Sequence, residues 1–248
     1  MPNQLDMVFF ANSGAEGVEA AIKYAKCATG KPAIIHCKKA YHGLTYGALS
    51  VNGDESFRSG FEPYLPDCRM IAFNDLDALE QELKRGDVAA FIVEPIQGKG
   101  VYIGSPGYLL AAQKLCRKYG ALFIDDEVQS GMGRTGKFLA IEHDGAGVDP
   151  DIVVLSKTLS GGFVPVAAVL CKKWIHDKVF SSMQRSVVHS STFSQGNFAM
   201  AAGLAALDVI DRHQLMKNAE RMGNLLGEGL KAMMPRFEFM KEVRWRGL

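Results

Sequence analysis

The sequence lacks a strong excess of charge of either sign. Lys and Arg total 28 and Asp and Glu total 27, which leaves a formal net charge of +1 at pH 7. This balance, without a basic stripe, gives no indication of a nucleic-acid or membrane-surface partner. No apolar run approaches the length of a membrane span, and residues 1–6 contain no basic region followed by an apolar run. These absences predict a cytoplasmic protein.

Cysteine is sparse, and its spacing shows no paired pattern. An odd number of scattered cysteines without a Cys-x-x-Cys motif is typical of reduced thiols rather than of disulfides or a zinc site. We therefore expect all five to be small buried hydrophobic residues. They are Cys27, Cys37, Cys68, Cys116 and Cys171.

Short apolar runs are the most frequent feature of the chain. Several are apolar at successive positions, as in strands covered on both faces, and helical stretches separate most of them. The predicted fold class is α/β, with a mostly parallel seven-stranded sheet covered by helices. Only residues 156–163 join the last two strands, so the seventh should be antiparallel or reached by an unusual path. The expected strands are Met7–Ala11, Ala33–Cys37, Met70–Phe73, Ala89–Val93, Ala121–Ile124, Ile152–Leu155 and Val164–Cys171.

One apolar run, Ile152–Leu155, leads directly into Lys157 and then into a turn that contains Gly161 and Gly162. Burial disfavours the ammonium form of lysine, so a lysine at the end of a buried strand can become a neutral nucleophile toward an aldehyde. A strand that reaches the surface at a solvated lysine explains the same residues, and on this stretch alone that explanation is favoured. The remaining motifs decide between the two.

The first expected strand ends in the sequence Asn12-Ser13-Gly14-Ala15-Glu16, and a helix is predicted to follow. Ser13 and Glu16 fit a capping box at its start. Glycine at the first turn lets a ligand approach the free amides, which favour a phosphate. A capped helix without a ligand explains the motif equally well, but the end of a strand in an open α/β sheet is where ligands bind.

Two further strands run into chemically distinctive residues. Tyr41 and His42 follow the second strand, and an aromatic ring there could stack on a flat cofactor. A turn with a half-buried tyrosine is the simpler interpretation of this motif alone. Glu94 ends the fourth strand, where its carboxylate could orient an active-site group or cap a helix.

Three consecutive acids, Asp125, Asp126 and Glu127, end the fifth strand. They repel one another, so we expect them to be matched by cations, a metal or an exposed face. One candidate partner is a protonated ring nitrogen. Asp126 precedes Lys157 by about one βαβ unit, which would place both groups at the same edge of neighbouring strands. A divalent metal is the rival explanation, and it ranks lower because no histidine has ligand spacing to these acids.

Six motifs occur in order between about residues 7 and 207. They are Asn12-Ser13-Gly14-Ala15-Glu16, Tyr41-His42-Gly43, Glu94-Pro95-Ile96-Gln97-Gly98, Asp126-Glu127-Val128-Gln129 with Gly133-Arg134-Thr135-Gly136, Ser156-Lys157 with Gly161-Gly162, and Ser191-Thr192-Phe193 with Gly196-Asn197. Together they resemble the class III aminotransferases, which are pyridoxal-phosphate enzymes of fold type I. The resemblance implies pyridoxal 5′-phosphate as cofactor and no metal.

The resemblance also implies how the residues would meet the cofactor ring. Lys157 would form the internal aldimine, leave when the donor amine displaces it, and then carry a proton between substrate carbon and cofactor carbon. Asp126 would keep the pyridine nitrogen protonated, which makes the ring an electron sink. Tyr41 would stack on one ring face, Val128 would pack against the other, and Gln129 would reach the ring hydroxyl. Lys157 and Asp126 are thus the expected catalytic residues.

The cofactor phosphate would be held by the Gly14 and Ala15 amides with the Ser13 hydroxyl. In the family, the residue at Thr192 contacts the phosphate bound by the neighbouring subunit, which implies a homodimer. The complete set of cofactor-binding residues implied by the resemblance is Ser13, Gly14, Ala15, Tyr41, His42, Glu94, Asp126, Val128, Gln129, Lys157 and Thr192.

Some positions depart from the family pattern. Lys99 stands where ornithine and 4-aminobutyrate enzymes usually have a second glutamate, Phe198 replaces a usual proline, and Ala167 replaces a common glycine. The chain is also short at both ends for this family. We expect residues 1–235 to form the cofactor-binding large domain and residues 236–248 to begin a truncated small domain.

The predicted function is a transaminase that moves an amino group from an amine or ω-amino acid to a 2-oxo acid. A decarboxylating transaminase or an aminomutase remains an alternative, because the substrate pocket rather than Lys157 and Asp126 separates them. A truncated protein that binds the cofactor without turnover is a further alternative. A cofactor-free Schiff-base aldolase would need neither the phosphate loop nor Asp126.

Overall fold

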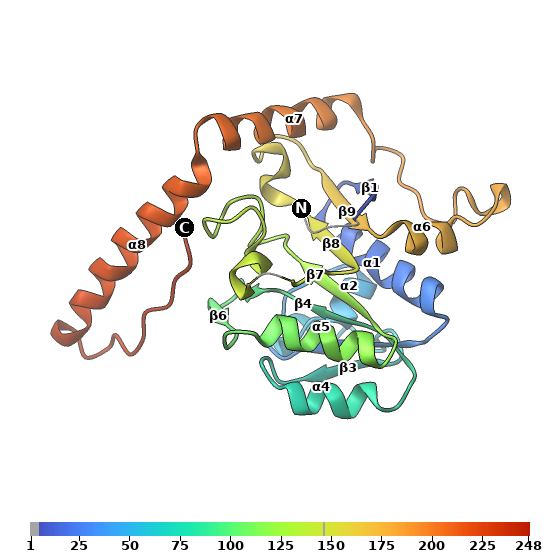
Figure 1. Ribbon diagram of the computed structural model, residues 1–248, viewed down its shortest axis with the longest axis horizontal. Coiled ribbons are helices and arrows are strands. Elements are labelled where there is room, and N and C mark those ends of the chain that lie inside the picture. The colour runs from blue at the N-terminus through green and yellow to red at the C-terminus, as the bar shows by residue number, and fades with distance from the viewer. Residues whose placement is uncertain (1–4, 146) are drawn as a thin grey trace.

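The computed structural model describes residues 5–145 and 147–248. A seven-stranded sheet with the order β1-β9-β8-β7-β4-β2-β3 lies at its centre (Figure 1). Only β9 runs against its neighbours, being antiparallel to both β1 and β8, while the other pairings are parallel. The predicted fold class and the antiparallel seventh strand are confirmed. The strands are β1 (Met7–Ala11), β2 (Ala33–Cys37), β3 (Cys68–Ile71), β4 (Val88–Val93), β7 (Leu122–Asp126), β8 (Ile152–Leu155) and β9 (Ala167–Cys171).

Continuous apolar sequence marks the central strands because both of their faces are covered. Every residue of β2, β4, β7 and β8 is buried. The third strand begins at Cys68 rather than at the predicted Met70. It is an edge strand, and its Arg69 forms ion pairs with Glu82 and Asp87, so an apolar pattern does not mark its start.

Helices cover the two faces of the sheet. On one face α1 (Gly14–Thr29) is packed with α2 (Tyr46–Ser50) and α6 (Lys173–Val179), and on the other lie α4 (Leu76–Leu83) and α5 (Tyr108–Lys118). The first helix was predicted to follow the first strand, and its apolar face is buried against the sheet. The shorter helices are α3 (Glu55–Arg58), η1 (Ala140–Asp144), η2 (Lys157–Ser160), η3 (Met183–Arg185) and η4 (Met234–Arg236).

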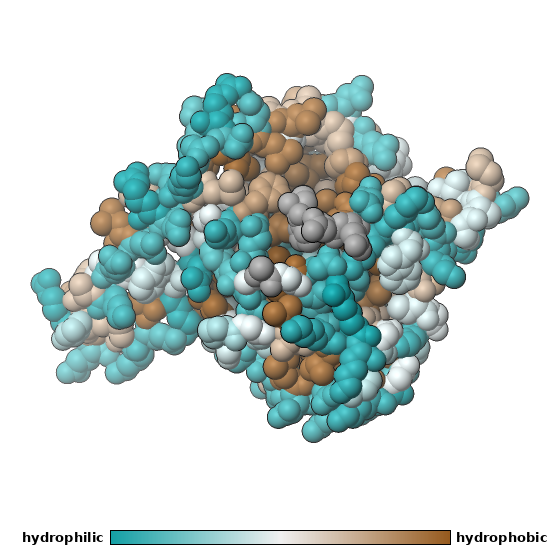
Figure 2. Space-filling model, viewed as in Figure 1, coloured by the Kyte–Doolittle hydropathy of each residue, from teal (hydrophilic) through white to brown (hydrophobic). Residues whose placement is uncertain are grey.

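Two long helices, α7 (Asn197–Arg212) and α8 (Leu215–Met233), follow the sheet. Figure 1 shows α7 crossing one side of the molecule and α8 extending away from the sheet. Large apolar side chains of α7 are exposed, and Figure 2 shows apolar surface beside this helix. The exposed apolar residues of α7 are Phe198, Leu204, Leu207 and Val209.

The last residues, 237–248, form no helix or strand and run back along α8 (Figure 1). The Trp245 indole N–H donates to Asn224 at 3.1 Å. The Arg244 guanidinium donates to the carbonyls of Gly100 and Val101. These contacts join the segment both to α8 and to a loop beside the sheet.

That loop belongs to a two-stranded hairpin that the sequence pattern did not predict. Its strands, β5 (Ile96–Gln97) and β6 (Tyr102–Ile103), are each two residues long, too short to show a periodicity.

The cysteine prediction was wrong for Cys27, which is exposed on α1, and Cys68 is only partly buried. No helix in the described part of the chain has the length and apolar character that crossing a membrane requires.

Candidate functional site

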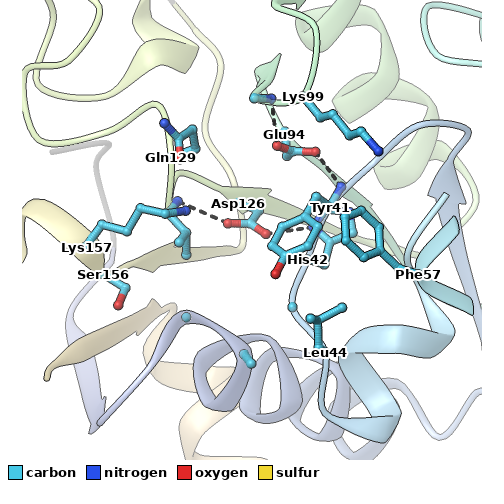
Figure 3. A pocket seen from close by; sticks show the side chains of 15 residues that line it. Tyr41, His42, Leu44, Phe57, Glu94, Lys99, Asp126, Gln129, Ser156 and Lys157 are labelled. Atoms are coloured by element: carbon cyan, nitrogen blue, oxygen red, sulfur yellow. Dashed lines mark hydrogen bonds and ion pairs between the residues drawn. The ribbon is translucent and has the colours of Figure 1, made fainter. Parts of the chain in front are cut away.

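A pocket of about 580 Å³ lies where the parallel strands end (Figure 3). Nine of the predicted cofactor-binding residues line it, while Ser13 and Thr192 do not. The fold thus brings together motifs that are up to 143 residues apart in the sequence. The lining residues are Gly14, Ala15, Tyr41, His42, Gly43, Leu44, Phe57, Glu94, Gly98, Lys99, Asp126, Val128, Gln129, Ser156 and Lys157.

Lys157 begins η2, two residues after β8 ends. Its φ of 44° lies in the left-handed region, which costs energy for a residue with a side chain and often marks functional positions. The strand before it is buried as predicted, but Lys157 itself is exposed. Burial therefore does not activate this amine in the single chain. Its side chain extends into the pocket toward Asp126 (Figure 3).

Asp126 is held from two sides at the end of β7. One carboxylate oxygen accepts the backbone N–H of Val128 at 3.0 Å, and the other lies 2.6 Å from Nδ1 of His42. Burial by itself lowers the pKa of His42, but the hydrogen bond and charge of Asp126, with the charge of Glu94, outweigh it and raise that pKa. When His42 is protonated, it forms a buried ion pair with Asp126.

The other two acids occupy different environments. Asp125 points to the opposite side of the strand, as the alternation of side chains requires, and neither carboxyl oxygen has a hydrogen-bond partner among the described residues. Burial is the main cause that raises the pKa of Asp125 well above its usual value, and the charges of Glu127 and Asp126 raise it further. Glu127 accepts hydrogen bonds from the Ser130 hydroxyl at 2.6 Å and the Ile141 amide at 2.8 Å.

Our expectation that cations, a metal or solvent match all three acids was therefore wrong for Asp125 and Glu127. The raised pKa of Asp125 favours its uncharged form, which lessens the repulsion among the three acids. Within residues 5–145 and 147–248, no cluster of three or more His, Cys, Asp or Glu side chains could hold a metal ion.

Glu94 joins two loops at the rim of the pocket. Its carboxylate accepts the amide of Tyr41 at 2.9 Å and the amide of Gly98 at 3.0 Å. Burial is the main cause that raises the pKa of Glu94. Of the two roles considered for this residue, the structure shows it orienting site loops rather than capping a helix.

The aromatic wall of the pocket has a member that the sequence motifs missed. Tyr41 meets Phe57 edge to face, with ring centroids 5.2 Å apart and an interplanar angle of 69°. Phe57 lies on the four-residue helix α3, and Leu44 lies in the turn before α2. Neither residue belongs to a motif, and only the folded chain brings Phe57 beside Tyr41.

The start of α1 closes the pocket on the side of the first strand. The Ser13 hydroxyl accepts the amide of Glu16 at 3.2 Å, but the Glu16 carboxylate accepts the amide of Asn12 rather than of Ser13. A Cβ on Gly14 would lie 2.8 Å from a methyl group of Val128, so a side chain there would force Val128 to shift. Ser13 lines a neighbouring cavity of about 430 Å³, which shares Gly14, Ser156 and Lys157 with the pocket.

Comparison with known proteins decides the family. The family model "Aminotransferase class-III" matches residues 1–248. This chain belongs to the class III aminotransferases. It is 44% identical over 248 residues to "Aminotransferase PigE" of Serratia sp. (strain ATCC 39006), covering 100% of this chain and 29% of that protein.

Solved structures of aminotransferases have the same fold. Ornithine aminotransferase of Toxoplasma gondii, which has partial occupancy of pyridoxal phosphate at its active site, aligns with a TM-score of 0.91 at 38% identity. The alignment covers 98% of this chain and 58% of the other. An (S)-enantioselective ω-transaminase of Thermomicrobium roseum aligns with a TM-score of 0.91 at 34% identity, covering 100% of this chain and 60% of the other. The chain thus spans less than two thirds of these relatives.

Class III aminotransferases use pyridoxal phosphate, and this pocket fits such a group. The side-chain-free position at Gly14 leaves amides at a helix start open to a phosphate, and the pocket holds an accessible amine at Lys157 and a carboxylate at Asp126. Tyr41 and Val128 offer apolar surface for a ring.

Thr192 is exposed and lies outside the pocket of its own chain. The segment that carries it is joined to the first strand end by a hydrogen bond of 2.6 Å from the Asn12 amide group to the Ser191 hydroxyl. Thr192 therefore lies near the first strand end without lining the pocket, and its exposed side chain can contact a second molecule.

Proposed function

We propose that this class III aminotransferase moves an amino group from an amine or ω-amino acid to a 2-oxo acid. The observation that carries the proposal is the convergence of Lys157 and Asp126 on one pocket from the ends of adjacent strands (Figure 3). A pyridine aldehyde needs a nucleophilic amine beside its aldehyde group and a buried carboxylate beside its ring nitrogen. A cofactor-free Schiff-base enzyme would have no use for the Asp126–His42 pair.

Each residue has a role in this proposal. The amides of Gly14 and Ala15 bind phosphate, helped by the Ser13 hydroxyl. Lys157 would hold the cofactor through its aldehyde group, and its free amine would move a proton within the pocket. Asp126 would keep a proton on the ring nitrogen, and the bound cofactor would supply the electron sink for the substrate carbon.

Three more residues surround the ring in the proposal. Tyr41 and Val128 would pack against its two faces, and Gln129 would hydrogen-bond its hydroxyl. A decarboxylating transaminase or aminomutase would use the same groups, and a chain that binds cofactor without turnover would also keep them. Transfer of the amino group to a 2-oxo acid distinguishes the proposed reaction from these alternatives.

The central test is trapping of the cofactor. Incubation with pyridoxal phosphate, reduction with borohydride and peptide mass mapping should place the label on Lys157, and Lys157→Ala should abolish both the label and amino transfer. Lys99→Ala, which removes the other lysine of the pocket, should leave the label in place. A label on another residue, or none, would refute the assignment. Conversion of bound cofactor to its amine form only by α-amino acids would refute the donor class.

We also propose that the protein works as a homodimer in which Thr192 contacts the phosphate bound by the partner. The exposed apolar side chains of α7 (Figure 2) and the exposed Phe163 and Phe193 support this, because a monomer rarely leaves such a surface in water. Sedimentation should give the mass of a dimer, and Phe198→Asp should shift it toward monomer. A cofactor-loaded monomer would contradict the proposal.

A further inference from the structure

Two lysines line the pocket, and the proposed chemistry uses only Lys157. The other, Lys99, lies on the far side of the pocket from Lys157, beside Phe57 (Figure 3). Its ammonium group is paired with the Asp54 carboxylate and lies 4.7 Å from the centre of the Phe57 ring. The far end of a substrate attached near Lys157 would therefore meet this group.

The side chain of Lys99 can exchange its partner at little cost. Its side chain is 52% exposed, and ion pairs in such positions contribute little to stability because water screens them. Lysine also carries its charge on a flexible stem with several rotatable bonds. An incoming carboxylate can replace Asp54 without leaving a buried charge unpaired.

The backbone that carries Lys99 is held in place more firmly than the side chain. Arg244 donates hydrogen bonds to the carbonyls of Gly100 and Val101, and the Glu94 carboxylate accepts the amide of Gly98. The ammonium group can thus move while its anchor stays at the pocket rim. A fixed anchor lowers the entropy cost of binding a substrate group.

The charged group that faces the pocket is the ammonium of Lys99 and not the carboxylate of Asp54. Lys99 is a lining residue, whereas Asp54 is not. The Asp54 carboxylate also accepts the amide of Ser56 at 2.9 Å, which fixes it as the cap of α3. A substrate with a positive far end would approach Lys99 first and be repelled, while a negative far end would be attracted.

We propose that Lys99 binds the distal carboxylate of the substrate, so that the pocket selects dicarboxylic 2-oxo acids as acceptors and ω-amino acids over diamines as donors. The inference rests on the proposed function, because it takes Lys157 as the reacting end of the pocket. In the absence of such a substrate, Asp54 takes the place of the carboxylate. The pocket therefore binds substrates with a negative distal end and disfavours those with a positive one.

A non-reacting ligand pair tests this without turnover. Calorimetry on the cofactor-loaded protein should show that glutarate binds more tightly than butyrate, which is glutarate with one carboxylate replaced by hydrogen. In Lys99→Met the glutarate affinity should fall about tenfold or more, with butyrate affinity within twofold. Lys99→Arg should keep most of the preference, because it keeps the positive charge.

Two further variants separate a specific role from a general loss of charge. Asp54→Asn keeps a side-chain oxygen for the helix cap and removes the competing carboxylate, so it should bind glutarate at least as tightly as the parent protein. Lys84→Met, at an exposed lysine paired with Glu80, removes a charge without touching the pocket and should change nothing.

The outcomes separate this inference from the proposed function. No preference for glutarate in the parent protein, or a preference that survives in Lys99→Met, overturns the role of Lys99. Failure of borohydride to label Lys157 in the same sample overturns the proposed function instead. If the cofactor does not load, the same titrations on the cofactor-free protein still decide whether Lys99 binds the second carboxylate.

Discussion

Asp126→Asn should lower kcat for amino transfer by about a hundredfold to a thousandfold, the range expected for losing a charged group placed at a reacting centre. Asparagine keeps the shape but carries no negative charge, so it cannot hold a proton on a ring nitrogen. Its side chain can still accept the Val128 amide, which holds the strand end in its present geometry. Steady-state kinetics with saturating cofactor measures the effect, and an unchanged kcat would contradict the proposed role.

Asp125→Asn is the matched control, since it makes the same chemical change one residue away on the opposite face of β7. Its kcat should stay within about threefold of the parent. Because the folded-state pKa of Asp125 is raised, the stability this acid contributes is complete below its unfolded pKa of about 4 and is lost as pH rises through the folded pKa. Asp125→Asn should lose less stability than the parent over that range. Loss of activity in this variant alone would mean that the two acids had been assigned the wrong way round.

The choice between these acids shows what can be inferred from sequence. Alternation along a strand requires that Asp125 and Asp126 face opposite sides, and the motif selects the second. Continuous apolar runs located the buried strands for the same reason, because solvent touches neither face. Parallel strands then bring their ends to one edge, which is why motifs far apart in the chain meet in one pocket.

Other features depend on contacts that no local pattern records. The exposure of Lys157 depends on where η2 leaves the sheet, not on the apolar strand before it. Phe57 joins Tyr41 only because α3 folds back over the pocket. The partner of Lys99 is Asp54, 45 residues earlier, and charge patterns in sequence do not identify such distant pairs.

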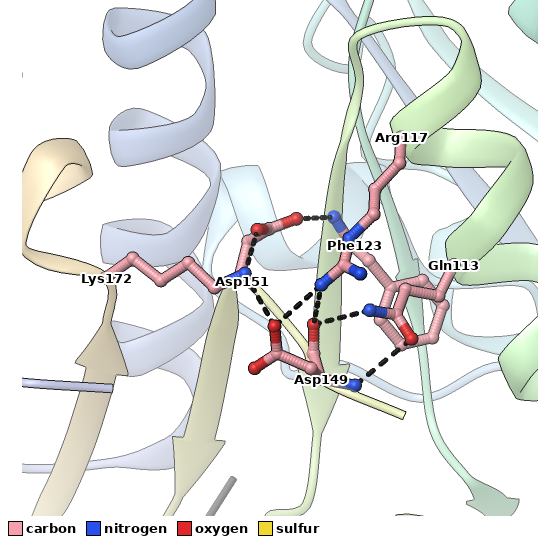
Figure 4. Close-up of polar contacts among 6 residues, drawn as sticks. All are labelled: Gln113, Arg117, Phe123, Asp149, Asp151 and Lys172. Atoms are coloured by element: carbon pink, nitrogen blue, oxygen red, sulfur yellow. Dashed lines mark hydrogen bonds and ion pairs between the residues drawn. The ribbon is translucent and has the colours of Figure 1, made fainter. Parts of the chain in front are cut away.

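A second large effect is expected far from the pocket, at the opposite end of β8. Asp151 precedes this strand, and its carboxylate accepts the Phe123 amide of β7 at 2.9 Å and the Lys172 ammonium at 2.9 Å (Figure 4). Lys172 follows β9 and also contacts Asp149, which is held by Arg117. These bonds join three neighbouring strands, and β8 is the strand that leads to Lys157.

Asp151→Ala should lower the free energy of unfolding by about 3 kcal/mol. Removing one member of a buried ion pair leaves the other charge with poorer compensation, and such losses are typically about 3–5 kcal/mol. The lower end applies because Lys172 keeps its contact of 3.0 Å with Asp149. The Phe123 amide also loses its acceptor. Urea denaturation followed by circular dichroism measures the change.

Asp177→Ala is the control for this substitution, because it removes an aspartate that pairs with Lys173 on the surface. The two side chains of that pair are 52% and 64% exposed, against 10% and 11% for Asp151 and Lys172. Water screens the exposed pair, so its loss should cost less than about 0.5 kcal/mol. Equal losses in the two variants would show that burial does not set the strength of the Asp151 network. A loss confined to Asp151→Ala would show that this buried network stabilises the strands that lead to the pocket.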